Sequence, residues 1–276
     1  IQGIIAYQDN QFSQASHFFK EVFQLIKGYR MEDWEMAELH YISGLSLLSE
    51  SRYILAIDYV KEAIFYFNQE ILIDRSIECL MFLGIAQKNS GVLKDALATF
   101  EKAKDINLKI ESSEFNGMIE HNLGSCYSLQ LQSDQALQHF FNALNSKHNP
   151  EDRIVTILSI LKEYHKNGDL QNALVWLEKG LETVQYVGDS KKDLYTNHFS
   201  VYGAILLENQ VLIPIFKKSL DYFEGKQDYK HCMIYCNVLA KRLAETKQYK
   251  QASIFYELGF HYHLKQSKVF SWEELS

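Results

Sequence analysis

Side chains that can bind a ligand through hydrogen bonds or charge recur along this chain at intervals of about 40 residues. The densest group consists of His121, Asn122 and Ser125, which lie within a single short run. Asn122 is the strongest candidate, because an amide offers one acceptor and two donors and can pair with both the N–H and the C=O of an extended peptide backbone. The other candidates occupy matching places in the chain and are Tyr41, Glu78, Lys162, Asn197, Ser200, Asn237 and Lys241.

The charged candidates suit a ligand that carries its own charges. Lys162 and Lys241 could each meet a carboxylate, and Glu78 could meet a cationic residue. Most polar residues on a helix are solvated or bridge neighbouring helices, and this interpretation is favoured for each candidate except one. For Asn122 we favour ligand binding, because this amide precedes a close-packed Leu-Gly pair, where an unpaired amide would cost about 1–3 kcal/mol.

Motifs that carry catalysis are missing from the sequence. It contains no P-loop, no GxGxxG, no HExxH and no GxSxG nucleophile elbow. Cys232 and Cys236 lie one helical turn apart with His231 beside them, which would permit a metal or redox site. Cysteines that pack as small buried apolar residues are the favoured interpretation. We therefore expect a protein that is not an enzyme and that uses no metal and no cofactor.

The composition narrows the class of partner and the compartment. With a formal net charge of −7 over 276 residues, the chain is a poor binder of polyanions by itself. No apolar run reaches the roughly 18–20 residues that span a bilayer, so no membrane association is expected. The four cysteines form no CxxC pair, and no secretory leader precedes them. These features predict a reduced, cytoplasmic protein.

Small residues recur in register and indicate repeated helical hairpins. The first position of this register is occupied in turn by Gly3, Gly44, Gly84, Gly124, Leu161, Gly203 and Ala240. Twelve residues after each comes a small residue in every unit except the sixth, where Ile215 takes the place. Small residues at both places let two antiparallel helices approach closely, and this pattern is typical of tetratricopeptide repeats.

We therefore predict an all-α fold, a right-handed tetratricopeptide-repeat superhelix of about seven helical hairpins. The first helix of each hairpin would line the concave wall, where the candidate residues lie. We expect a single peptide-binding domain over 1–276 that is truncated at its N-terminus, because Gly3 falls in the middle of a repeat. The predicted repeats lie near 1–30, 34–70, 74–110, 114–148, 150–187, 192–224 and 229–265.

Three runs carry a resemblance to a known family. Ala37-Glu-Leu-His-Tyr41, Ser76-Ile-Glu-Cys-Leu80 and His121-Asn-Leu-Gly-Ser-Cys-Tyr127 resemble the quorum-sensing peptide receptors of the Rap, NprR, PlcR and PrgX group, the RNPP family. The long repeat is also typical of that family, and the similarity is strongest to the NprR-like transcriptional regulators. It covers essentially the whole chain.

The resemblance implies a partner and leaves the output open. It implies that a short signalling oligopeptide binds in the concave groove, partly through asparagines. Asn122 takes that role by resemblance, and Asn197 and Asn237 are placed by repeat position only. The output would be transcription regulation through DNA bound by a missing N-terminal helix-turn-helix. The alternatives are a Rap-type phosphatase or antagonist of a response regulator, inhibited by peptide, and a generic tetratricopeptide scaffold for protein interaction.

Aromatic residues near the C-terminus suggest two further alternatives. They would either pair two chains as a homodimer or cap the final repeat. The group consists of Phe255, Tyr256, Phe260, Tyr262, Phe270 and Trp272.

Overall fold

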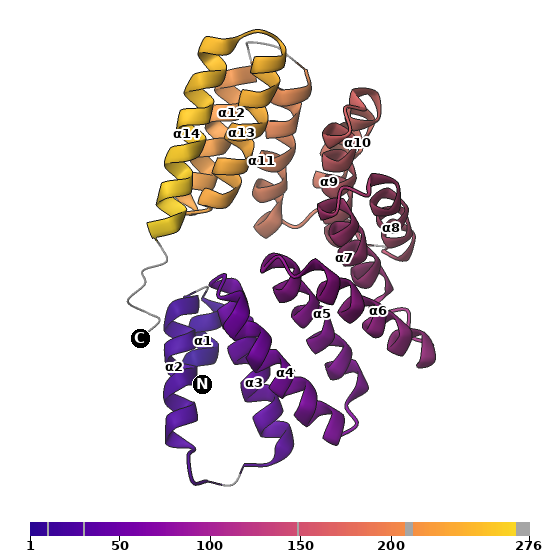
Figure 1. Ribbon diagram of the computed structural model, residues 1–276, viewed down its shortest axis with the longest axis vertical. Helices are drawn as coiled ribbons and strands as arrows, with labels where there is room; N and C mark the ends of the chain where they lie inside the picture. The colour runs from indigo at the N-terminus through magenta and orange to yellow at the C-terminus, as the bar shows by residue number, and fades with distance from the viewer. Residues whose placement is uncertain (10, 30, 148, 208–211, 269–276) are drawn as a thin grey trace. The chain divides into compact units, whose positions relative to one another are not determined.

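The computed structural model consists of α-helices joined by short turns, and it describes residues 1–9, 11–29, 31–147, 149–207 and 212–268 (Figure 1). No strand occurs in these ranges. The predicted all-α class is confirmed. The chain divides into two compact units, residues 1–148 and 149–276, and each is described by itself. The single domain over 1–276 stays a prediction.

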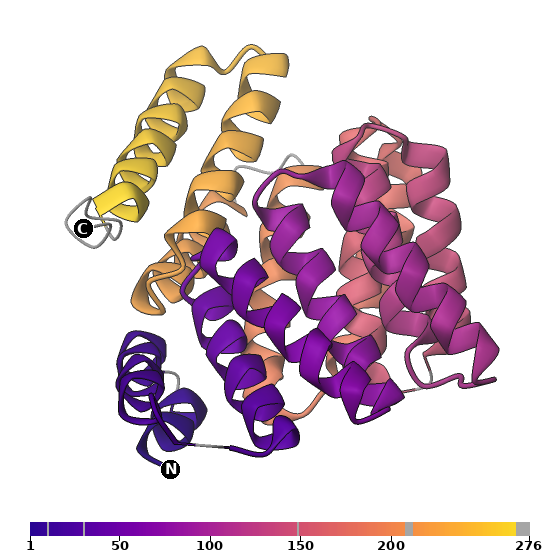
Figure 2. The same cartoon turned by 60° about the horizontal axis from the view of Figure 1, so that its bottom comes forward.

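The first unit is built from four helical hairpins that lie next to one another in chain order (Figure 2). Each odd-numbered helix forms a hairpin with the helix that follows it, and each hairpin packs on the next hairpin along the chain. The helices are α1 (Gln2–Gln8), α2 (Phe12–Leu25), α3 (Asp33–Ser49), α4 (Tyr53–Gln69), α5 (Ile73–Asn89), α6 (Leu93–Lys109), α7 (Asn116–Leu129) and α8 (Ser133–Ser146).

The second unit contains three further hairpins. Its helices are α9 (Pro150–Lys166), α10 (Leu170–Val184), α11 (Asp189–Leu206), α12 (Leu212–Gly225), α13 (Tyr229–Glu245) and α14 (Tyr249–Lys268). The start of α9 is fixed by its cap: the Asn149 side chain accepts hydrogen bonds from the backbone N–H groups of Glu151 and Asp152, and Pro150 takes the first helical position.

Glycines allow the two helices of a hairpin to touch. A Cβ on Gly84 would lie 2.5 Å from Cε1 of Phe100, and a Cβ on Gly124 would lie 2.7 Å from Cδ1 of Phe140. Each ring follows its glycine at the same spacing in the sequence, because the spacing closes one hairpin. The periodic glycines therefore have a packing cause, as the sequence predicted.

The sixth position of the glycine register does not follow this rule. Among the described residues, a Cβ on Gly203 would meet only Cδ2 of Leu177, at 3.9 Å. A close contact between a glycine and a ring is found instead between two successive hairpins, where the ring of Phe199 in α11 fills the space over Gly180 in α10. This repeat is irregular because the residue 16 positions after Gly203 is Ser219, where the regular hairpins have Phe100 and Phe140.

The turns within hairpins share one backbone conformation. The second residue after the helix end has positive φ at Ser51, Gly91, Leu131 and Gly168, with values of 63°, 87°, 62° and 76°. The next residue donates back into the helix, as when Gln132 N–H bonds the carbonyl of Tyr127 at 2.9 Å. The sequence indicated breaks at the glycines but not at Ser51 and Leu131, where a residue other than glycine adopts the left-handed conformation.

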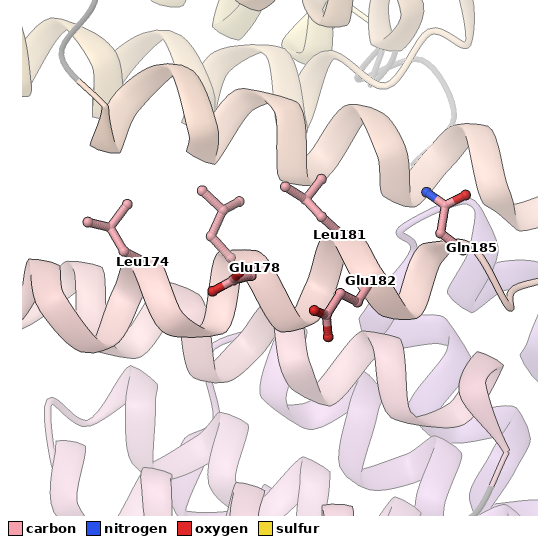
Figure 3. A pocket seen from close by; sticks show the side chains of 6 residues that line it. Leu174, Glu178, Leu181, Glu182 and Gln185 are labelled. Carbon is pink, nitrogen blue, oxygen red and sulfur yellow. The ribbon is translucent and has the colours of Figure 1, made fainter.

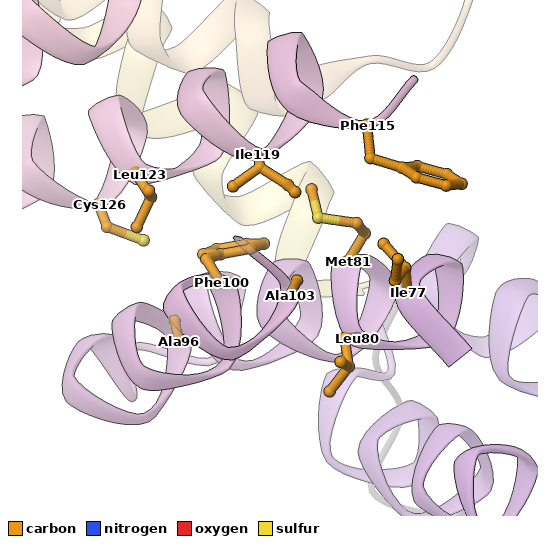
Figure 4. Close-up of a cluster of buried hydrophobic side chains, with 10 residues drawn as sticks. All are labelled: Ile77, Leu80, Met81, Ala96, Phe100, Ala103, Phe115, Ile119, Leu123 and Cys126. Atoms are coloured by element: carbon orange, nitrogen blue, oxygen red, sulfur yellow. The ribbon is translucent and has the colours of Figure 1, made fainter. Parts of the chain in front are cut away.

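The core of the first unit continues from one hairpin into the next. Phe100 of α6 lies in a cluster with residues of α5 and of α7, including Met81 and Leu123 (Figure 4). Phe100 and Leu123 have no exposed surface. One hairpin alone would leave these faces open, so the stacking of hairpins stabilises each of them.

Candidate functional site

Asn122 lies in α7 with 5% of its surface exposed, and its amide is already engaged by the protein. The ammonium of Lys88 in α5 donates to Asn122 Oδ1 at 3.1 Å, and Asn122 Nδ2 donates to the carbonyl of Met118 at 3.0 Å. An amide has two N–H donors and two acceptor lone pairs. One donor and one lone pair therefore have no partner within the part of the chain that the structure describes.

The two candidates beside Asn122 are half-buried. Ser125 Oγ donates to the carbonyl of His121 at 3.0 Å, one turn earlier in the same helix. The imidazole of His121 lies against Phe140 of α8, with 5.5 Å between the ring centroids. Asn122, His121 and Ser125 are thus brought together on α7, and Lys88 joins them from α5.

Tyr41 and Glu78 belong to a second polar cluster, centred on Arg75. The guanidinium of Arg75 makes two hydrogen bonds to Glu38, at 3.1 and 2.6 Å, and a further one to Glu78. It also lies over the ring of Tyr41, 4.1 Å from the centroid, and the Tyr41 hydroxyl donates to Glu78 at 3.4 Å. Burial, together with the Glu78 carboxylate, raises the pKa of Tyr41 to about 12.

Arg75 was not among the residues predicted to form the site, and Glu78 was expected to meet a cationic group of a ligand. The chain supplies a cation of its own at this place. A signal existed, because Arg75 and Glu78 are three residues apart and therefore share one helix face. With two carboxylates for one guanidinium, the cluster keeps a surplus negative charge.

In the second unit, Lys162 is a half-buried lysine of α9. Burial lowers the pKa of its amino group to about 8, while the Asp228 carboxylate opposes that change and Lys230 adds to it. Asp228 is the N-cap of α13 and accepts from both the backbone N–H and the ring of His231. In α11, His198 is buried and hydrogen-bonded to the Tyr235 hydroxyl of α13.

No hydrogen bond, ion pair or ring contact given by the described residues joins the remaining predicted residues of this unit. Asn197 Nδ2 donates to the carbonyl of Asp193 at 2.8 Å, and Ser200 is half-buried. Asn237 is exposed on α13, and its Oδ1 lies 2.6 Å from where a Cβ on Gly259 of α14 would stand. Lys241 is exposed on the same helix. Their role in a binding site stays a prediction.

Glu120 marks a buried ionic cluster for which the sequence analysis gave no indication. Its carboxylate pairs with Lys104 of α6 at 2.8 Å and with His139 of α8 at 2.7 Å, and the ring of His139 stacks on Tyr127. Burial raises the pKa of Glu120, but the hydrogen bonds from His139 and Lys104 outweigh it and lower the pKa to about 2. The cluster ties three helices together.

The cysteines have the environment of packing residues. All four are free and buried, and burial raises the pKa of the Cys232 and Cys236 thiols to about 12. Within the described ranges, no group of three or more His, Cys, Asp or Glu side chains is arranged to hold a metal ion. No described helix has both the length and the apolar composition to cross a membrane.

An open hollow of 590 Å³ lies along α10, and none of the predicted site residues lines it (Figure 3). Three leucines and two glutamates line it together with Gln185. Two of its leucines, Leu174 and Leu181, are 37% and 43% exposed. Its lining is therefore mainly apolar, from the three leucines, with negative charge from the two glutamates.

The C-terminal aromatic residues divide into two kinds. Phe255 and Tyr262 are buried, whereas Tyr256 and Phe260 are 46% and 62% exposed. The Tyr262 hydroxyl donates to Glu224 of α12 at 2.8 Å, so this ring is held within the unit. Phe270 and Trp272 lie outside the described residues. Pairing of two chains through this region stays a prediction.

Comparison with known proteins gives one curated relative and several solved structures. Over 268 residues, 94% of the chain, it is 29% identical to the transcriptional activator NprA of Geobacillus stearothermophilus, and it spans 66% of that protein's length, just under two thirds. The apo form of RapI superposes with a TM-score of 0.81 at 17% identity and covers 96% of both chains. NprR in complex with its cognate peptide NprX gives a TM-score of 0.64 at 16% identity, over 94% of this chain and 74% of that one. No family model matches the chain.

These comparisons confirm two predictions. The fold is of the tetratricopeptide type seen in these proteins. The chain resembles the RNPP group of tetratricopeptide quorum-sensing receptors, nearest the NprR-like regulators, as the runs ending at Tyr41, Leu80 and Tyr127 indicated.

Proposed function

We propose that this chain is the receptor part of a regulator that binds a short signalling oligopeptide and passes the binding to a transcriptional output in the cytoplasm. The observation that carries the proposal is Asn122, whose amide is held by Lys88 and Met118 and still has one donor and one acceptor to offer. The similarity to NprA, a transcriptional activator, and to NprR, which binds the peptide NprX, supports it.

The amide suits an extended ligand. A peptide backbone presents an N–H and a C=O close together, and one Asn side chain can pair with both. Because Lys88 and Met118 fix the orientation of Asn122, little rotamer entropy would be lost on binding. The peptide would shift the equilibrium between two states of the receptor only by its difference in affinity for them. The chain would act without catalysis.

The test begins with the ligand. The protein is purified from its native host, and peptides released from it are identified by mass spectrometry. Calorimetry then compares that synthetic peptide with wild-type protein and with Asn122→Ala. We expect the substitution to weaken binding by about 1–3 kcal/mol, roughly tenfold or more.

The matched control is Asn145→Ala, because Asn145 is an exposed asparagine of α8 in the same unit. This variant should bind like the wild type. Equal affinity of the wild type and Asn122→Ala would remove Asn122 from the binding site. Recovery of no peptide from the native host would count against the receptor itself.

The second candidate is a Rap-type antagonist or phosphatase of a response regulator, and the superposition on RapI over 96% of both chains favours it. The two outputs differ in what a gene deletion changes. Loss of a transcriptional regulator changes transcript levels with the phosphorylation of response regulators unaltered. Loss of a Rap-type phosphatase raises phosphorylation of a response regulator first, and the purified phosphatase lowers it in vitro. A Rap-type antagonist is recognised instead by direct binding of the purified protein to a response regulator.

A further inference from the structure

The positively charged side chain of Lys162 has no counter-ion among the described residues. Its side chain is half-buried in α9, and the described residues place neither a hydrogen bond nor an ion pair on its ammonium. An ammonium withdrawn from water without a counter-ion is costly, so such groups in proteins are normally paired. A bound anion at Lys162 would therefore supply the missing counter-ion and stabilise the ammonium.

The surroundings of Lys162 come from two neighbouring helices, because α9 and α13 both pack on α11. From α11, the buried His198 lies near enough for the Lys162 charge to lower its pKa further, burial being the main cause. From α13, Asp228 and Lys230 act on the charge of Lys162, while His231 and the hydrogen-bonded Tyr235 lie against His198. Among the described residues, Asp228 is the one carboxylate that acts on the charge of Lys162, and it faces two ammonium groups, those of Lys162 and Lys230.

The one nearby carboxylate is committed elsewhere. Asp228 Oδ1 accepts the backbone N–H of His231 at 3.2 Å, and Asp228 Oδ2 lies 2.6 Å from Nδ1 of the same residue. These bonds cap α13 and orient the imidazole. Asp228 therefore acts on Lys162 through space and leaves its hydrogen-bonding positions open.

We propose that Lys162 binds a carboxylate group of the ligand, at the surface shared by α9, α11 and α13; this rests on the proposed peptide-receptor function. A carboxylate fits better than a phosphate for two reasons. Lys162 is a point charge without the fork of an arginine, which suits a single negative charge. The Asp228 carboxylate nearby would repel a dianion more strongly than a monoanion.

The experiment uses a pool of random heptapeptides synthesised in two forms, with a free C-terminal carboxylate and with a C-terminal amide. Each pool is passed over immobilised wild-type protein, Lys162→Met, and the control Lys218→Met, and retained peptides are quantified by mass spectrometry. Lys218 is an exposed lysine of α12 and is not among the groups that act on the charge of Lys162. Thermal unfolding confirms that all three proteins are folded.

The proposal expects wild-type and Lys218→Met proteins to enrich carboxylate-bearing peptides at least severalfold over neutral ones, and Lys162→Met to lose that enrichment. Loss confined to the free-acid pool identifies the ligand's C-terminus, and loss among Asp- or Glu-containing amidated peptides identifies a side chain. Peptides retained equally by wild type and Lys162→Met would overturn the Lys162 assignment and leave the receptor function standing. Retention of no peptide by the wild type would overturn the receptor function, and the assignment with it.

Discussion

The ammonium of Lys88 donates a hydrogen bond to Oδ1 of Asn122 at 3.1 Å and thereby ties α5 to α7. The amide bonds the carbonyl of Met118 as well, one turn earlier in its own helix. Asn122 therefore has a structural role in addition to the proposed one. The two roles are compatible, because a side chain that is already oriented by the protein is better prepared to bind a peptide backbone.

The strength of this tie can be measured by a double-mutant cycle. Lys88→Met, Asn122→Ala and the double variant are unfolded in urea beside the wild type. We expect a coupling free energy of about 0.5–1.5 kcal/mol, the net value of a hydrogen bond. The cycle is needed because Lys88 has other interactions that the single substitution also removes. A coupling indistinguishable from zero would mean that the bond contributes nothing to stability.

The contact between Gly124 and Phe140 predicts a steric effect. A Cβ at position 124 would lie 2.7 Å from Cδ1 of Phe140 and 3.0 Å from the carbonyl of Ala136, so the helices of this hairpin would have to move apart. Gly124→Ala should lower the free energy of unfolding by about 1–3 kcal/mol. The control is Gly225→Ala, because a Cβ there meets nothing within 4 Å. Equal stability of the two variants would contradict the packing role.

Contacts within one hairpin were predictable from the sequence. The pairing of Gly124 with Phe140 depends only on two helices joined by a short turn, so the spacing along the chain determines it. The turn at Gly168 was also predictable, because glycine readily adopts the left-handed conformation that ends a helix. The turn at Leu131 was not, because leucine carries no signal for the left-handed conformation that its hairpin imposes.

Contacts between hairpins were not predictable in the same way. Arg75 reaches Glu38 in the preceding hairpin, and that pairing depends on how two first helices lie side by side. From the sequence, packing gave no reason for a polar residue at position 122. In the structure, the hydrogen bond from Lys88 in another repeat gives such a reason. The environment of Lys162 likewise depends on α11, which packs on α9, and on the charge of Asp228 at the start of α13.

Glu120 predicts an acid-sensitive component of stability. Its folded pKa of about 2 lies below the unfolded value of about 4.3, so its contribution is present above pH 4.3 and is lost as the pH falls toward 2. We expect a contribution of about 2–3 kcal/mol, because the Glu120 carboxylate is buried and both of its partners are at least partly shielded from water. Urea unfolding measured over this range should be steep in the wild type and flatter in Glu120→Gln. Glu101→Gln, an exposed control on α6, should follow the wild type. Equal slopes in the wild type and Glu120→Gln would remove Glu120 as the cause.

Replacing a partly buried charged residue usually lowers stability, but we expect replacement of Lys162 to raise it. Burial lowers the pKa of its amino group from 10.5 to about 8, which means that the folded state disfavours the ammonium relative to the unfolded chain. At pH 7 both states are protonated, and the difference amounts to about 3 kcal/mol against folding. Methionine has a similar length and no charge, so Lys162→Met should raise the free energy of unfolding by about 2–3 kcal/mol at that pH.

The pH dependence of Lys162→Met separates this cause from a simple gain in packing. A folded pKa below the unfolded one means that the contribution of Lys162 to stability increases as the pH rises from about 8 to about 10.5. The advantage of the variant should therefore shrink over that range, whereas Lys218→Met should stay level with the wild type throughout. A variant that is less stable than the wild type at pH 7, or whose advantage does not change with pH, would show that Lys162 already has its counter-ion. The instability would be relieved by a bound carboxylate, and so the same substitution that stabilises the free protein should remove its preference for an anionic ligand.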